Sequence, residues 1–196
     1  MEKGGCASAL AAVGLRATSR IGFADELRLG LRGTTRRVWG RRGTKARQRL
    51  HLTYEWRSMF AAVDGQSGRI WWAWVTTMQA ADLRPVLAAL RERDAVDGLV
   101  WDGARSHTDA QVRGLGLPPV ALPPYSPELN PAERLFEEIR RHVEGKAYAT
   151  LDDEVAAVEA FLEELDADPA RVRQLCGWDW ITDALDALPE PEEKAA

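Results

Sequence analysis

The stretch LPPYSPELNPAERLF, residues 122–136, marks the start of a helix more clearly than any other part of the chain. Three prolines in its first six residues favour an extended approach, because each restrains its own φ and keeps the preceding residue out of the helical region. Asn130 then stands where an N-cap is expected, Pro131 is the first helical residue and Glu133 the third. Apolar residues continue at helical spacing, at Leu135, Ile139 and Val143.

Glu133 has two interpretations. An N-cap residue followed three positions later by Glu is typical of a capping box, in which the carboxylate only accepts from a backbone N–H. Two aspartates upstream favour a chemical role instead: Asp25 in RIGFADE (20–26) and Asp102 in DGLVWD (97–102), each at or near the end of an apolar, strand-like run. Three acids from two strands and one helix could together hold a pair of divalent metal ions.

Length and composition predict one soluble domain with short appendages. The 196 residues can bury a sizeable core, and no apolar run approaches the ~20 residues that a membrane-spanning helix needs. The Ala-rich opening MEKGGCASALAAVGL (1–15) lacks the strong apolar centre of a secretory leader. Cys6 and Cys176 match no metal or disulfide pattern, so a reducing cytoplasm is the simplest context.

The net charge of −4 hides a gradient along the chain. Residues 1–57 carry 13 Lys/Arg against 4 Asp/Glu, whereas residues 150–196 carry 3 against 14. A polyanion is therefore attracted to the first third and repelled by the last. Basic residues crowd the Gly-punctuated segment 27–50, where Trp39 lies among them, and we expect a nucleic-acid contact there rather than an ordinary solvated surface. The expected DNA-binding residues are Arg36, Arg37, Arg41, Arg42, Lys45 and Arg47.

The periodicity predicts alternating strands and helices. Strands are expected at 20–25, 50–63, 69–76, 97–102 and 119–122, and helices at 79–94, 107–113, 131–145 and 151–165. An apolar segment at 171–188 and an acidic, disordered tail should follow. The run RIWWAWV (69–75) is apolar on both faces, which favours burial in a covered sheet over base stacking. The first and fourth strands can lie side by side in a mixed sheet, which would place Asp25 and Asp102 on neighbouring strands.

Carboxylates suit magnesium, which binds few protein ligands and retains several waters. Two such ions about 4 Å apart activate an attacking oxygen and stabilise a leaving one in phosphoryl transfer. In this scheme Asp102 bridges both ions, while Asp25 and Glu133 each bind one. Without metal the three negative charges repel one another, so the pKa of at least one carboxyl should rise.

The pieces FADE (23–26), WDGARSH (101–107) and residues 122–136 resemble the catalytic domain of mariner-superfamily DDE transposases, in the bacterial insertion-sequence branch of the IS six-thirty type. With RRVWGRRG (36–43), the likeness covers residues 20–145. It implies an RNase H-like α/β fold, a five-stranded mixed sheet flanked by helices, here with extra C-terminal helices. It also implies two Mg²⁺ or Mn²⁺ ions bound by Asp25, Asp102 and Glu133. The family cuts element ends by hydrolysis, and the freed 3′-OH then attacks target DNA, typically at TA.

Other positions are interpreted through the same resemblance. Gly103 stands where the family usually has Asn, which predicts altered local geometry. His107 fits the family's His after the second Asp and could contact a DNA phosphate, or it could be an ordinary helix-start histidine. Glu26 is expected to be a supporting acid. Glu137 could replace Glu133 as a ligand, but pairing with Arg140 or Arg141 on the helix surface is the simpler role.

The expected organisation is an N-terminal extension (1–19), a catalytic domain (20–165) and a C-terminal helical segment with an acidic tail (166–196). Full-length relatives carry helix-turn-helix modules, so we expect this chain to be the catalytic half, working with a separate DNA-recognition half, as a homodimer on double-stranded DNA in the cytoplasm near the nucleoid. Two alternatives remain: a non-catalytic remnant that only binds DNA or another protein, and an RNase H-type nuclease acting on RNA–DNA hybrids.

Overall fold

The computed structural model describes residues 3–31, 39–45, 47, 52–102, 114–123 and 126–191. A helix, α1 (Lys3–Ala12), precedes three strands, β1 (Ile21–Gly30), β2 (Trp56–Asp64) and β3 (Arg69–Val75). Helix α2 (Ala80–Glu92) leads to β4 (Gly98–Trp101) and β5 (Pro119–Ala121). A 3₁₀ turn, η1 (Pro127–Leu129), is followed by α4 (Pro131–Val143), α5 (Leu151–Asp166), α6 (Pro169–Cys176) and α7 (Asp179–Asp186).

The five strands form one mixed sheet in the order β3-β2-β1-β4-β5. The hairpin β2–β3 and the pair β1–β2 are antiparallel, whereas β1–β4 and β4–β5 are parallel. Helix α2 makes the crossover before β4, as a return to the sheet in the parallel direction requires. The predicted five-stranded mixed sheet flanked by helices is confirmed, including the neighbouring positions of the first and fourth strands.

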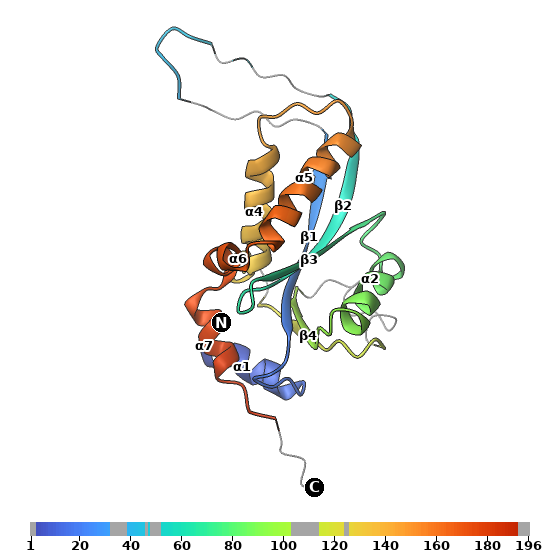
Figure 1. Cartoon of the computed structure of the whole chain (residues 1–196), viewed down its shortest axis with the longest axis vertical. Coiled ribbons are helices and arrows are strands. Elements are labelled where there is room, and N and C mark those ends of the chain that lie inside the picture. Colours follow the sequence, from blue (N-terminus) through green and yellow to red (C-terminus); the bar gives the residue numbers. More distant parts are fainter. Residues whose placement is uncertain are drawn as a thin grey trace.

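Helices cover both faces of this sheet (Figure 1). On one face, Phe23 and Val63 pack with Leu135 of α4 and Leu162 of α5 in the larger apolar cluster. On the other face, a smaller cluster joins Phe60 and Trp71 of the sheet to the three buried leucines of α2, Leu83, Leu87 and Leu90. The run 69–75 thus lies in a sheet that is covered on both faces, which agrees with its apolar residues on both sides and with the predicted core position.

Two tryptophans of β3 bind helix α5. The indole N–H of Trp72 donates to Glu159 Oε2 at 3.1 Å, and that of Trp74 donates to Oε1 of the same carboxylate. Trp72 and Trp74 are only partly buried and contact the larger cluster. Glu159 therefore fixes the helix to the edge strand of the sheet.

Several predicted boundaries were wrong. The first strand runs to Gly30 rather than ending at residue 25, because Leu27 and Leu29 stay buried while the alternate residue Arg28 is exposed. The second strand begins at Trp56 rather than at residue 50. Helix α1 lies in the segment for which no element was predicted; its buried residues Cys6 and Leu10 belong to the larger cluster. The apolar segment 171–188 falls in two short helices, and the helix predicted at 107–113 lies outside the described residues.

The segments before residue 20 and after residue 165 pack on the same core as the sheet. Val172 of α6 and Ile181 of α7 are buried in the larger cluster. The β2–β3 turn fits tightly against α6: a Cβ on Gly68, whose φ is +78°, would lie 2.2 Å from the Pro169 carbonyl oxygen, and one on Gly65 would lie 2.6 Å from that of Cys176. The division of the chain at residues 20 and 166 stays a prediction. None of the described helices is both long and apolar enough to pass through a membrane.

Candidate active site

Asp25 and Asp102 lie at corresponding positions of two parallel strands. The described pairing of β1 with β4 ends at Phe23 opposite Val100. If the same register is continued for two more residues along both strands, Asp25 lies opposite Asp102, which directly follows β4. Asp25 is half-buried in the middle of β1, where its other neighbour is Ala61 of β2, and Asp102 is exposed. The carboxyl end of β4 thus lies beside the middle of β1.

Glu133 comes to this site from the first turn of α4. Asn130 is the N-cap, and its side-chain oxygen accepts from the Ala132 backbone N–H at 3.1 Å. In a capping box the Glu133 carboxylate would accept from the Asn130 N–H, but that N–H donates to the Pro127 carbonyl at 2.9 Å. Glu133 instead lies 3.6 Å from Arg140 (Oε2 to Nη1), and its side chain is 37% exposed. The carboxylate is therefore not used as a helix cap.

The pKa of Asp25 shows that the three acids share one electrostatic environment. It is raised from 3.8 to about 6, chiefly because burial penalises the charged form. A hydrogen bond from the Glu26 backbone N–H at 2.8 Å opposes the rise. The negative charges of Glu133, Glu26 and Asp102 add to it, in that order. The expected rise of one carboxyl pKa is found at Asp25, and the charges of the other two acids contribute to it.

Asn130 also contacts the site, although the sequence predicted only its role as the N-cap of the helix. Its side-chain NH₂ donates to Asp25 Oδ2 and to the Ala24 carbonyl, both at 3.0 Å. The residue is only 2% exposed. The position of Asn130 in the chain predicted its cap, but its bonds to a strand 105 residues away depend on how α4 packs on the sheet.

Comparisons with known proteins agree with this architecture. Residues 20–155 match the family described as DDE superfamily endonuclease. The chain belongs to this DDE endonuclease family. Among curated proteins none matches the sequence.

Solved structures of the Mos1 mariner transposase share the fold. The chain is similar to Mos1 transposase in a paired-end complex with the left transposon end (TM-score 0.64, 17% identity, 93% of this chain and 60% of that one). It is similar to the Mos1 strand transfer complex (0.66, 16%, 97% and 62%) and to the isolated Mos1 catalytic domain (0.56, 15%, 93% and 91%). The chain thus spans about 60% of the length of the Mos1 chains in the DNA complexes. The predicted RNase H-like fold is confirmed.

The carboxylates of this DDE endonuclease suit a hard divalent cation in chemical type. The pKa of the half-buried Asp25 is raised chiefly by burial and further by the charges of Glu133, Glu26 and Asp102, and a bound cation would offset these charges. Within the part of the chain that the structure describes, however, no group of three or more His, Cys, Asp or Glu side chains is arranged to hold an ion. The donor set fits the metal, and the carboxylates would need to turn towards one another to bind it.

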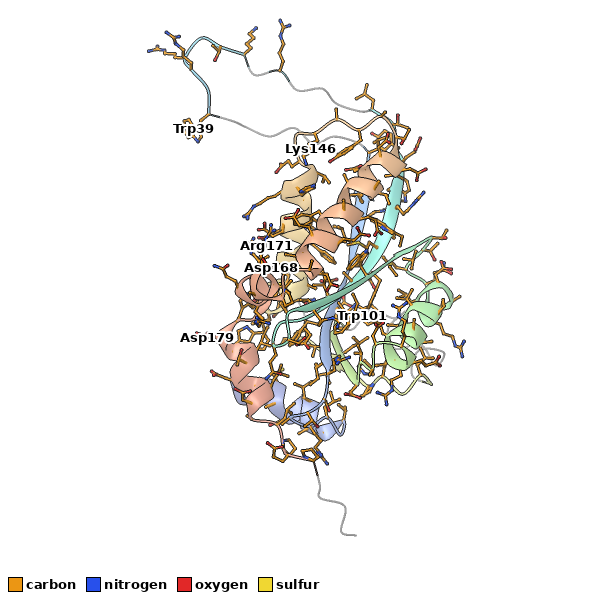
Figure 2. The ribbon with its side chains drawn as sticks, in the orientation of Figure 1. Trp39, Trp101, Lys146, Asp168, Arg171 and Asp179 are labelled. Carbon is orange, nitrogen blue, oxygen red and sulfur yellow. The ribbon has the colours of Figure 1, made fainter. Side chains whose placement is uncertain are left out.

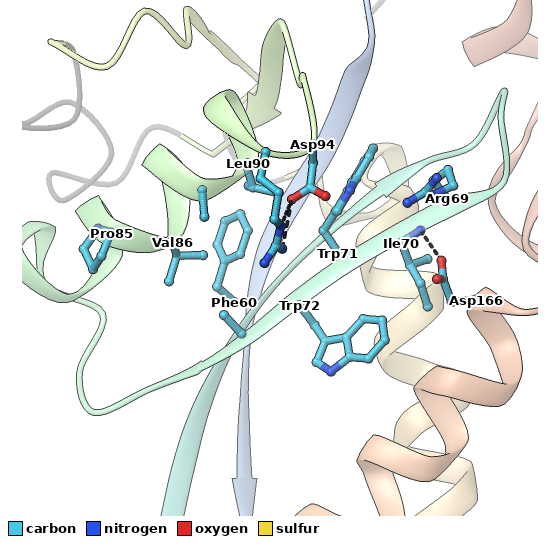
Figure 3. Close-up of a pocket in the computed structure, with 13 residues that line it drawn as sticks. Phe60, Arg69, Ile70, Trp71, Trp72, Pro85, Val86, Leu90, Asp94 and Asp166 are labelled. Atoms are coloured by element: carbon cyan, nitrogen blue, oxygen red, sulfur yellow. Dashed lines mark hydrogen bonds and ion pairs between the residues drawn. The ribbon is translucent and has the colours of Figure 1, made fainter.

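The surface formed by the described residues is hollowed beside α4 and beside α2. A groove of about 530 Å³ runs beside Glu133 along α4, lined by Pro127, Glu128, Asn130, Glu133, Arg134, Glu137 and Trp178. A second hollow of about 550 Å³ lies between β3 and α2, with Trp71, Val86 and Leu90 among its walls (Figure 3). None of the three acids lines this second hollow, whereas Glu133 and Asn130 line the groove along α4.

The described part of the predicted basic segment lies beyond the strand ends. Residues 39–45 extend from the body of the protein beyond the ends of β1 and β2, with Trp39 fully exposed (Figures 1 and 2). Four of the predicted DNA-binding residues are exposed there: Arg41, Arg42, Lys45 and Arg47. Arg36, Arg37 and His107 lie outside the described residues.

The predicted partner of Glu137 was wrong. Glu137 pairs with Arg134 at 2.7 Å, one turn earlier on α4, rather than with Arg140 or Arg141. Arg140 lies beside Glu133, and Arg141 pairs with Glu138 at 2.6 Å. The role of Glu137 as a surface ion-pair residue nevertheless agrees with its 57% exposed side chain.

Proposed function

We propose that this DDE endonuclease is the catalytic part of a transposase, which cuts double-stranded DNA at the ends of a mobile element and joins them to a target. The proposal is supported by the placement of three acids on neighbouring elements of the fold. β1 contributes Asp25, the end of β4 contributes Asp102 in matching register, and the first turn of α4 contributes Glu133. The pKa of Asp25 is raised chiefly by burial, and the charges of Glu133 and Asp102 add to the rise, which supports their nearness to Asp25.

The three carboxylates would hold two Mg²⁺ or Mn²⁺ ions, which supply Lewis-acid activation and charge neutralisation for phosphoryl transfer. Asp102 follows the end of β4 and is the most exposed of the three, so it would be open to an ion from solvent. Asp25 is anchored in the sheet and gives the site a fixed point. Glu133 lies on the rim of the groove along α4, where a DNA strand can approach it.

The finer assignments rest on the sequence. The motif around residues 122–136 supports placement in the IS six-thirty branch of the mariner superfamily, with attack at TA. The exposed cluster Arg41, Arg42, Lys45 and Arg47 supports a phosphate contact. A homodimer in the synaptic complex, a separate helix-turn-helix half and a cytoplasmic location near the nucleoid complete the proposal.

The test is nicking and strand transfer on a supercoiled plasmid that carries candidate element ends, with and without Mg²⁺ or Mn²⁺. Asp102→Asn and Glu133→Gln should each abolish the metal-dependent products. Glu163→Gln is the matched control, because it makes the same change on the exposed surface of α5, outside the groove along α4, and should leave activity intact.

The alternatives give different results in the same assay. Metal-independent DNA binding without cleavage would support the non-catalytic remnant. Preferential cleavage of an RNA–DNA hybrid over duplex DNA would support the RNase H-type nuclease. Cleavage that survives both Asp102→Asn and Glu133→Gln would reject the proposed site.

A further inference from the structure

Asn130 makes three hydrogen bonds in three directions. Its oxygen accepts from the Ala132 N–H at the start of α4, and its nitrogen donates to the Ala24 carbonyl and to Asp25 Oδ2. These partners fix the orientation of the amide: a flipped side chain would turn its oxygen towards two other oxygens and its NH₂ towards an N–H. Among short side chains, only an amide offers both an acceptor and two donors.

The side-chain amide of Asn130 lies where the pairing of β1 with β4 ends. The described pairing between β1 and β4 ends at Phe23, so the Ala24 carbonyl, one residue later, lies beyond the last β4 pair. Asn130 donates to this carbonyl in place of a strand. A buried carbonyl without a partner costs free energy, and the bond removes this cost while holding the start of α4 against β1.

We propose that Asn130 is a positioning residue that sets the spacing and orientation of Asp25 relative to Glu133. One side chain holds the Asp25 carboxylate and also begins the helix whose first turn carries Glu133. The Asp25 carboxylate is held on one oxygen by Asn130 and on the other by the Glu26 N–H at 2.8 Å, so its rotation is restrained from both sides. This inference rests on the proposed function for its consequence, the binding of a divalent ion.

The first experiment measures the link without metal. Asn130→Ser keeps a capping oxygen at the start of α4 but is too short to reach β1. A double-mutant cycle of Asn130→Ser with Asp25→Ala, followed by urea unfolding of the full chain without divalent ions, should show coupling of about tenfold in the unfolding equilibrium constant. Additive effects would overturn the proposal.

The second experiment measures Mn²⁺ binding by calorimetry. Asn130→Ser should weaken Mn²⁺ binding by about tenfold or more, as loss of a ligand-orienting partner typically does. Thr150→Ala is the matched control: it removes the N-cap of α5, which is likewise a side-chain oxygen on a backbone N–H, and it should lower stability without changing Mn²⁺ affinity. Asn130→Thr, which also caps and fills more of the buried space, serves if Asn130→Ser does not fold.

The outcomes separate the two proposals. If Glu133→Gln loses Mn²⁺ binding but Asn130→Ser binds Mn²⁺ as tightly as wild type, the role of Asn130 is overturned. The proposed function then stands. The unfolding cycle could also show coupling between Asn130 and Asp25 while wild type and Glu133→Gln bind Mn²⁺ equally or not at all. That result would overturn the proposed function, and with it the role of Asn130 at an ion site. Failure of both Asn130 variants to fold would assign the residue to the fold alone.

Discussion

Arg140 Nη1 lies 3.6 Å from Glu133 Oε2, so the glutamate of the candidate site has a cation as its neighbour on α4. Both side chains are substantially exposed, 54% for Arg140 and 37% for Glu133. Exposed pairs of this kind contribute little, about 0.2–1 kcal/mol. In the proposed ion site the guanidinium would therefore compete with a metal ion for the Glu133 carboxylate without preventing its binding.

We expect Arg140→Gln to tighten Mn²⁺ binding by up to about fivefold, because it removes this competing charge. Calorimetric titration at low and high ionic strength measures the effect, and the difference from wild type should shrink as salt screens the charge. Arg141→Gln is the matched control, since Arg141 pairs with Glu138 rather than with Glu133. Weaker binding in Arg140→Gln would show that the arginine orients the carboxylate.

Metal binding should be linked to the protonation of Asp25. Its pKa is about 6, and a divalent ion binds the deprotonated form. Mn²⁺ affinity should therefore be nearly constant above about pH 7 and fall by about tenfold per pH unit below pH 6, with protons released on binding. Titration across this range in buffers of different ionisation enthalpy gives both quantities. An affinity that stays unchanged through pH 6 would place Asp25 outside the ion site.

Glu154 should contribute a second pH dependence, this time to folding. It is 6% exposed, its pKa is raised by burial from 4.5 to about 6, and its Oε2 has no hydrogen-bond partner among the described residues. Because the folded pKa is the higher one, the stabilising contribution is fully present below pH 4.5 and is lost as the pH rises through about 6. Asp25 adds a loss of the same sign.

Glu154→Gln should therefore flatten the fall in the free energy of unfolding between pH 4.5 and about 6. Urea unfolding at a series of pH values measures the profile. Asp152→Asn, two residues earlier, is the control and should follow the wild-type profile, because its side chain is 79% exposed and its ion pair with Arg57 lies at the surface. A Glu154→Gln profile parallel to that of the wild type would mean that the carboxyl is solvated.

The basic segment should control the salt dependence of DNA binding. Neutralising Arg41, Arg42, Lys45 and Arg47 together should weaken duplex binding and lower the slope of log K against log salt by up to about 3.6, if each residue contacts one phosphate. Fluorescence anisotropy over a salt series gives the slope. Neutralising Arg171 and Arg173, on α6, is the control for net charge. If the change in slope per charge removed is the same for the four residues of the exposed segment and for the two arginines of α6, the exposed segment does not contact DNA.

Glu159 should matter for stability but not for chemistry. Glu159→Gln puts an NH₂ group against one of two indole N–H donors, so at least one bond to Trp72 or Trp74 is lost. We expect a loss of about 1–3 kcal/mol in the free energy of unfolding, measured with urea. Glu163→Gln, one turn later on the exposed surface of α5, should change little. A stability of Glu159→Gln equal to that of wild type would show that the two indoles do not anchor the helix.

The sequence predicted those features that depend on local chemistry and on general rules of sheet topology. Proline restraint and the N-cap located the start of α4, and the crossover rule placed the strand of Asp25 beside that of Asp102. What depends on tertiary packing was missed. Helix α1 has little amphipathic pattern because most of its residues are small, and the bond between Asn130 and β1 has no signal in either segment alone.

The contact of the β2–β3 turn with α6 limits which residues evolution can place there. At Gly68 both the positive φ and the Pro169 carbonyl exclude a side chain, and at Gly65 the Cys176 carbonyl does the same. A saturation library should therefore tolerate only glycine at these two turn positions, although surface turns usually accept many residues. Where homologous DDE endonucleases share these glycines, their invariance would report the fit of the turn against the C-terminal helices and not a contact with the nucleic acid.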